Sequence, residues 1–291
     1  MNIDTETAGA TTTATTTATT SATLFDQKKI RTIALSTFGS FLRNKVILLF
    51  GSLFACVVLL MMTPLLGFKA MTTASNAQQM QGFILNEVAV VVSMVSAFGS
   101  LLAAWAAADS VATEMKSGTI LAVMARPLRR WEFLAGKYLG VMMLMSVYVV
   151  AMLGVTFLLA WLGGQSFHVS FWTLLAYPMV RYAIWAAIAM FLVTMLHPIL
   201  VMGLVIVLAT LIQIFGSTAS HMPNWLRLPV HLVLPLTNLI SEQRFLTITR
   251  ASLRPFPWTN HLTALVYGLD YALVCFLLAV FVFQRRSLSR D

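Results

Sequence analysis

The sequence has 291 residues, of which 59% are hydrophobic and only 10% are charged. Soluble domains carry about 25% charged residues, so this composition excludes an ordinary soluble protein. The formal net charge of +9 would also suit a nucleic-acid-binding protein, but the basic residues flank long apolar segments and form no nucleic-acid motif. We therefore expect a membrane protein without a nucleic-acid partner.

The N-terminal residues 1–24 are rich in Thr and Ala and lack the basic start and apolar stretch of a signal peptide. They hold too little apolar surface to fold, which predicts a disordered tail before a single membrane domain over residues 25–291. Apolar residues then recur at helical spacing between basic ends: Ile30, Ile33, Ala34, Phe38, Phe41 and Leu42. This stripe predicts an amphipathic helix on the inner membrane surface, with anionic membrane lipid beside it; a simple extension of the first span is the alternative.

Six apolar segments are each long enough to cross ~30 Å of hydrocarbon as a helix. They lie at about residues 46–66, 88–108, 138–162, 173–195, 198–216 and 262–283. The predicted fold class is therefore an all-α polytopic membrane protein with six transmembrane helices and an N-terminal interfacial helix.

An even number of spans places both termini on one side of the membrane. Most of the 19 basic residues lie before the first span, between spans two and three, or after the last span, so the positive-inside rule makes those regions cytoplasmic. The predicted topology has a cytoplasmic loop at 109–137, a tight cytoplasmic turn around His197 and Pro198, and a long extracytoplasmic loop at 217–261.

The loop from Asp109 to Gly140 is the one cytoplasmic connection long enough for a pair of helices. Its pattern predicts a helix, a turn capped near Ser117, a short apolar helix ended by Pro127, and then a charged and aromatic segment that leads into the third span.

This loop resembles that of type-two ABC exporter permeases, in which a Glu is followed by Gly-Thr, then by Pro with basic and acidic residues, then by Gly-Lys. The matching residues here are Glu114, Gly118, Thr119, Pro127, Arg130, Glu132, Gly136 and Lys137. The C-terminal segment YALVCFLLAVFVFQRRSLSRD is similar to the last span of the same family. The resemblance covers about residues 28–291 and is strongest to permeases of copper-enzyme maturation operons.

The resemblance implies that residues 113–133 form a cytoplasmic coupling helix that docks on a separate ABC ATPase subunit. It implies a permease subunit of an exporter in the bacterial plasma (inner) membrane, working as a homodimer or with a similar permease by alternating access. The ATPase-coupling residues would be Glu114, Ser117, Gly118, Thr119, Pro127, Arg129, Arg130, Glu132 and Lys137. The alternative interpretation is an ordinary solvated connector.

The sequence contains no G-x-x-x-x-G-K-[ST] phosphate-binding loop, because Gly136-Lys137 is followed by Tyr138 and has no Gly at the required position before it. We therefore predict that the chain is not an enzyme and has no cofactor of its own. ATP and magnesium would bind to the partner subunit.

Two charges are predicted within the membrane: Arg181 lies about eight residues into the fourth span and Asp270 about eight into the sixth. A lone charge at the bilayer centre costs at least ~2.5 to 3.5 kcal/mol, so we predict that these two residues pair. Glu87 is an alternative partner for Arg181. The pair would either fix the packing of the spans or line a substrate path.

Other classes of protein stay open but are less well supported. The histidines share no metal-ligand spacing and the two cysteines lie inside apolar segments, so no metal is expected. An integral-membrane enzyme would need a motif such as H-E-x-x-H or G-x-S-x-G, and neither occurs. An importer permease would carry two alanines after the loop Glu, where this chain has EMKSGT. A membrane anchor or assembly factor without transport activity is not distinguished from a permease by sequence.

Overall fold

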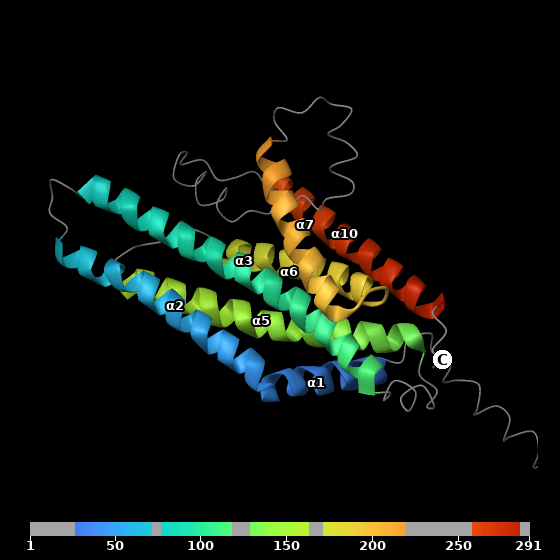
Figure 1. Ribbon diagram of the computed structural model, residues 1–291. Helices are drawn as coiled ribbons and strands as arrows, with labels where there is room; N and C mark the ends of the chain where they lie inside the picture. Colours follow the sequence, from blue (N-terminus) through green and yellow to red (C-terminus); the bar gives the residue numbers. More distant parts are fainter. Residues whose placement is uncertain (1–26, 72–76, 118–128, 163–170, 219–257, 286–291) are drawn as a thin grey trace, which may run out of the picture.

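The computed structural model describes residues 27–71, 77–117, 129–162, 171–218 and 258–285 (Figure 1). Nearly all of these residues are helical. In chain order the helices are α1 (Gln27–Arg43), α2 (Lys45–Met71), α3 (Ala77–Ser117), α5 (Arg130–Leu162), α6 (Phe171–Val193), α7 (Pro198–Thr218) and α10 (Trp258–Arg285). The predicted tail over residues 1–24 lies outside the described residues.

The six predicted spans correspond to six separate helices, α2, α3, α5, α6, α7 and α10, and the fourth span, 173–195, was predicted two residues beyond the end of α6. By length and apolarity, α3, α5, α6 and α10 can each cross a membrane, and α1 with α2 qualifies as a bent pair among the described residues. Helix α7 contains a shorter apolar stretch, Pro198–Ile212. The all-α polytopic fold is therefore confirmed, and six spans are compatible with it.

Helices α3 and α5 extend well beyond the expected membrane segments. The 41 residues of α3 span about 60 Å, twice the ~30 Å of the hydrocarbon core. Its helix continues to Ser117, and α5 begins at Arg130. The predicted loop at 109–137 is thus helical at both ends. Its polar residues were interpreted as loop, but they are equally compatible with a helix that extends beyond the bilayer.

The predicted tight turn between the fourth and fifth spans is present. Helix α6 ends at Val193, and the carbonyl of His197 accepts the backbone N–H of Val201 at 3.1 Å. Pro198 is the first residue of α7, a position where its missing N–H has no hydrogen bond to lose.

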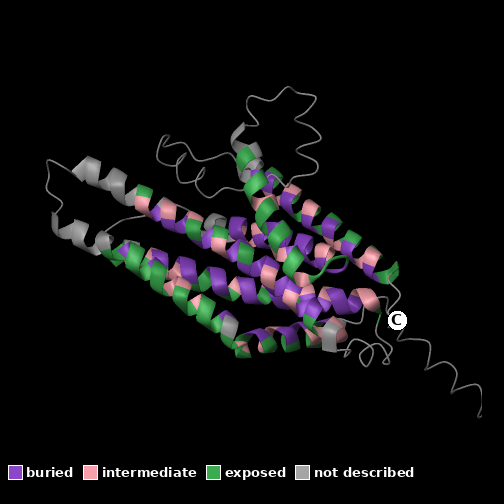
Figure 2. Cartoon of the chain, in the orientation of Figure 1, coloured by how far each residue is buried: buried purple, intermediate pink, exposed green. Residues whose placement is uncertain are grey.

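Helix α6 occupies the centre of the bundle, packed against α3, α5, α7 and α10. Of its apolar segment 72% is buried, against 17% of that of α10 (Figure 2). Buried alanines line α3 and α6, among them Ala103, Ala107, Ala186 and Ala187. Small side chains of this kind let membrane helices approach closely and pack by van der Waals contact.

Helix α1 is bent by 65° from α2, so the two do not form one straight helix. Its buried stripe faces α5. A Cβ on Gly136 would lie 2.7 Å from Cβ of Ile33, and one on Gly140 would lie 2.7 Å from Cβ of Thr37, so both glycines are needed for this contact. Of the predicted stripe, Leu42 is exposed, and Thr37, which was not part of the stripe, is buried.

Candidate functional site

The residues predicted to contact a partner lie around the point where α3 ends and α5 begins. Gly118, Thr119 and Pro127 fall outside the described residues, and Ser117 is the last residue of α3. The remaining five are described: Glu114, Arg129, Arg130, Glu132 and Lys137. Figure 1 shows that this end of the bundle also holds α1 and the C-terminal end of α10.

Glu114 and Lys137 form an ion pair between the last turns of α3 and the first turns of α5. The side chains are only 25% and 10% exposed, respectively. The ammonium of Lys137 also lies 5.7 Å from the ring centroid of Phe133, a distance at which a cation is attracted to the ring face. The ion pair therefore joins the two helices that enter and leave the loop.

Glu132 fixes the start of α5. Its Oε2 accepts the backbone N–H of Arg129 at 3.1 Å, and the Arg129 carbonyl accepts the N–H groups of Glu132 and Phe133. A Glu three residues after the N-cap makes this contact in a capping box, and its negative charge suits the positive end of the helix dipole. Glu132 is 4% exposed, so the cap is also shielded from water.

Arg130 links the start of α5 to the end of α10. Its Nη1 donates to the carbonyls of Phe283 at 3.3 Å and Gln284 at 3.0 Å. Carbonyls in the last turn of a helix have no N–H donor within the helix, so Arg130 supplies one, and a cation there also offsets the negative end of the dipole. The rings of Phe133 and Phe283 are stacked, with their centroids 6.3 Å apart.

We call Glu114, Arg130, Glu132 and Lys137 the loop-base cluster. Through it the first two turns of α5 contact α3 and α10. Gly136 and Gly140, also on α5, contact α1. The first two turns of α5 therefore lie against three other helices: α1, α3 and α10. The sequence pattern predicted the residues of the cluster, but no pattern in the sequence indicated that Arg130 contacts α10.

A second polar group lies inside the bundle, between α3, α5 and α6. The hydroxyls of Tyr148 and Tyr182 both donate to the carbonyl of Val95, at 3.1 and 3.2 Å. A Cβ on Gly99 would lie 2.3 Å from the Tyr182 hydroxyl oxygen, so this position requires glycine. Sequence reasoning missed the two tyrosines, because an isolated Tyr in an apolar segment has no distinguishing pattern.

Arg181 belongs to the same region. Its Nη1 donates to Oγ of Ser96 on α3 at 3.4 Å. Asp270 lies on the exposed side of α10, and Glu87 on α3 is partly buried. The pairing of Arg181 with Asp270, or with Glu87, stays a prediction.

Among the described residues, no set of three or more His, Cys, Asp or Glu side chains gathers in a way that could hold a metal ion. Cys56 is exposed and Cys275 is buried, and both are free thiols.

Comparison with known proteins adds one finding to this geometry. A family model described as ABC-2 family transporter protein matches residues 31–288, which takes in the loop-base cluster and the helices that it joins. No curated protein matches the sequence.

Proposed function

Because the chain belongs to the ABC-2 transporter family, we propose that it is the membrane-spanning subunit of an ATP-binding-cassette exporter. Members of this family are the permease subunits of ABC transporters and are not themselves catalytic. They associate with an ABC ATPase subunit, to which we assign the binding of ATP and magnesium. We place the protein in a bacterial inner membrane with both termini in the cytoplasm, consistent with its flanking basic residues.

The observation that carries this proposal is the family match over residues 31–288. This match does not identify a cargo, and the substrate is left unassigned. A second permease, either another copy or a similar chain, would complete the transport path.

The loop-base cluster supports a coupling role for the segment between α3 and α5. A loop that transmits force must be anchored to helices that cross the membrane, since a flexible anchor would absorb the movement. Here the ion pair of Glu114 with Lys137 joins α3 to α5, and Arg130 joins α5 to α10. Movement of a docked ATPase would then shift the membrane helices and open the path alternately to each side.

The test is co-purification from the native host in mild detergent, with mass spectrometry of whatever accompanies the tagged chain. We expect an ABC ATPase subunit with the wild type and its loss from the Glu114→Ala/Arg130→Ala double variant. Arg31→Ala is the matched control, because Arg31 is an exposed cation on α1 outside the cluster, and it should retain the ATPase.

An exchanged variant and the wild-type sample give two further results. The exchanged variant Glu114→Lys/Lys137→Glu keeps an ion pair in the reverse direction and should retain ATPase binding, because the cluster acts by positioning the loop. Absence of any ATPase from the wild-type sample, with the protein intact and monodisperse, would contradict the proposed function.

A further inference from the structure

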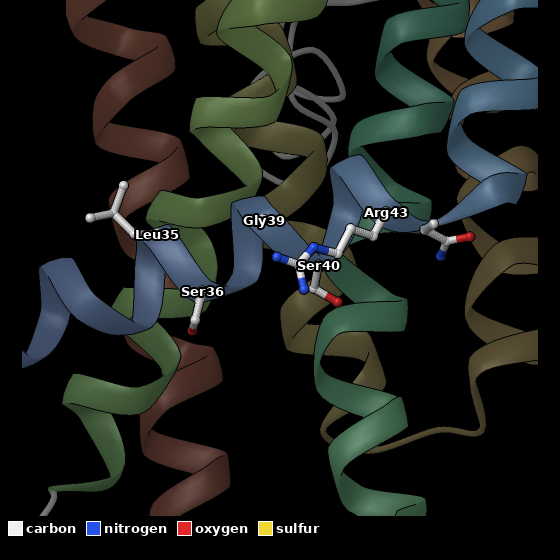
Figure 3. Close-up of a pocket in the computed structure, with 6 residues that line it drawn as sticks. Leu35, Ser36, Gly39, Ser40 and Arg43 are labelled. Atoms are coloured by element: carbon white, nitrogen blue, oxygen red, sulfur yellow. The ribbon is translucent and has the colours of Figure 1, made fainter.

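A hollow of about 720 Å³ lies on α1 where this helix meets α2. Its lining residues recur at helical spacing along one side of α1 and at the bend: Leu35, Ser36, Gly39, Ser40, Arg43 and Asn44. Figure 3 labels the first five of them on α1. This side is the one turned away from α5, because Ile30, Ala34 and Thr37 are buried against the bundle. The hollow therefore opens toward the surroundings of the protein.

The hollow exists because the middle of this helix side has small residues. A Cβ on Gly39 would meet no atom within 4 Å, and Ser36 and Ser40 flank it with short polar side chains. Figure 3 shows the Arg43 guanidinium turned back toward Ser40. The lining thus offers a cation, hydroxyl groups and the amide of Asn44 around an open space.

The charge of this region selects an anion. Residues 27–45 contain Lys28, Lys29, Arg31, Arg43 and Lys45 and no Asp or Glu. No carboxylate is among the described residues that line the hollow. A guanidinium presents several N–H donors in a planar fork that matches a phosphate group.

The position of the hollow relative to the bilayer selects an anion with acyl chains. Directly after the bend, α2 exposes Leu48, Leu49 and Leu53, as expected of a helix side that contacts lipid tails. Leu35 is also exposed beside the polar lining. The bend therefore lies where the hydrocarbon ends and the headgroups begin. A free phosphate has no acyl chains and would make no contact with these leucines.

We propose that this hollow binds the headgroup of an anionic phospholipid in the leaflet that contains α1. Arg43 pairs with the phosphate, Ser40 and Asn44 hydrogen-bond to the headgroup, and the acyl chains lie against Leu48 and Leu49 of α2. Because α1 packs on α5 at Gly136 and Gly140, a bound lipid would hold α1 against the loop-base cluster. The proposal requires only that the chain lies in a membrane, so it stands or fails separately from the exporter function.

The experiment is native mass spectrometry of the purified protein, with any subunit that accompanies it, titrated with phosphatidylglycerol or phosphatidylcholine. We expect phosphatidylglycerol to be retained in preference to phosphatidylcholine. Arg43→Gln should weaken that binding by about tenfold, since hydrogen bonds to a charged group are lost. Gly39→Phe should weaken it similarly by filling the hollow, whereas Gly39→Ala should bind nearly as the wild type does.

Arg31→Gln is the control for general charge. Arg31 lies about 18 Å along the helix from Arg43, beyond the ~8 Å Debye length at 0.15 M salt, so its loss should change binding by less than about twofold. Equal losses in Arg31→Gln and Arg43→Gln would overturn the site in favour of diffuse surface charge. Equal retention of both lipids, or displacement of phosphatidylglycerol by millimolar inorganic phosphate, would also overturn it.

Discussion

Replacing Glu114 by Gln removes the carboxylate from Lys137 without changing the size of the side chain much. Lys137 is only 10% exposed in the pair, so water can compensate the stranded ammonium only in part. Breaking a buried pair costs ~3–5 kcal/mol and breaking an exposed one ~0–1 kcal/mol. With Glu114 at 25% exposure, we expect a loss of about 2 kcal/mol of stability.

A loss of that size lowers the thermal midpoint by about 4–8 °C in a chain of this length. The midpoint is measured in detergent for Glu114→Gln, Lys137→Gln and the double variant, with Arg31→Gln as an exposed control. Removing both charges leaves no buried cation, so the double variant should lose less stability than the two single losses added together. Strictly additive losses, or a single-variant shift no larger than that of Arg31→Gln, would refute a buried, coupled pair.

Three further predictions concern other contacts. Gly99→Ala should lower the thermal midpoint because its Cβ would lie 2.3 and 2.4 Å from the hydroxyl oxygen and Cζ of Tyr182, at a cost of ~1–3 kcal/mol; a shift no larger than that of Gly154→Ala, whose Cβ would meet no atom within 4 Å, would exclude this clash as the cause. Arg130→Ala should speed amide hydrogen exchange in the last turn of α10, and unchanged exchange would contradict the contact. If Arg181 and Asp270 pair, Arg181→Gln and Asp270→Asn should be less damaging together than separately in a double-mutant cycle, whereas additive effects would count against pairing.

The sequence determined which segments form long apolar helices. Long apolar segments have no other stable form in a bilayer, because every backbone N–H and C=O must be hydrogen-bonded within the chain. The sequence also predicted the turn before α7, since His197 and Pro198 suit the N-terminal end of a helix. The bounds of the loop at 109–137 were harder to predict, because α3 continues to Ser117 and its polar residues are compatible with a helix outside the bilayer.

The sequence also indicated which residues form the candidate site, through the loop pattern from Glu114 to Lys137. It did not show that these two residues pair, because the loop separates them and only the packing of α3 on α5 brings their side chains together. The contact of Arg130 with the end of α10 is still more distant along the chain. The partner of Arg181 seen in the structure, Ser96, depends in the same way on how α3 and α6 are rotated against each other.

The tertiary structure alone decided that α6 is central and α10 peripheral. Both helices are apolar enough to cross the membrane, and hydropathy cannot rank them because lipid tails are as apolar as the protein interior. In a soluble protein, water would force polar residues onto the outer side of a peripheral helix. In a bilayer that difference vanishes, so small residues, close contacts and hydrogen bonds between helices decide which helix lies inside.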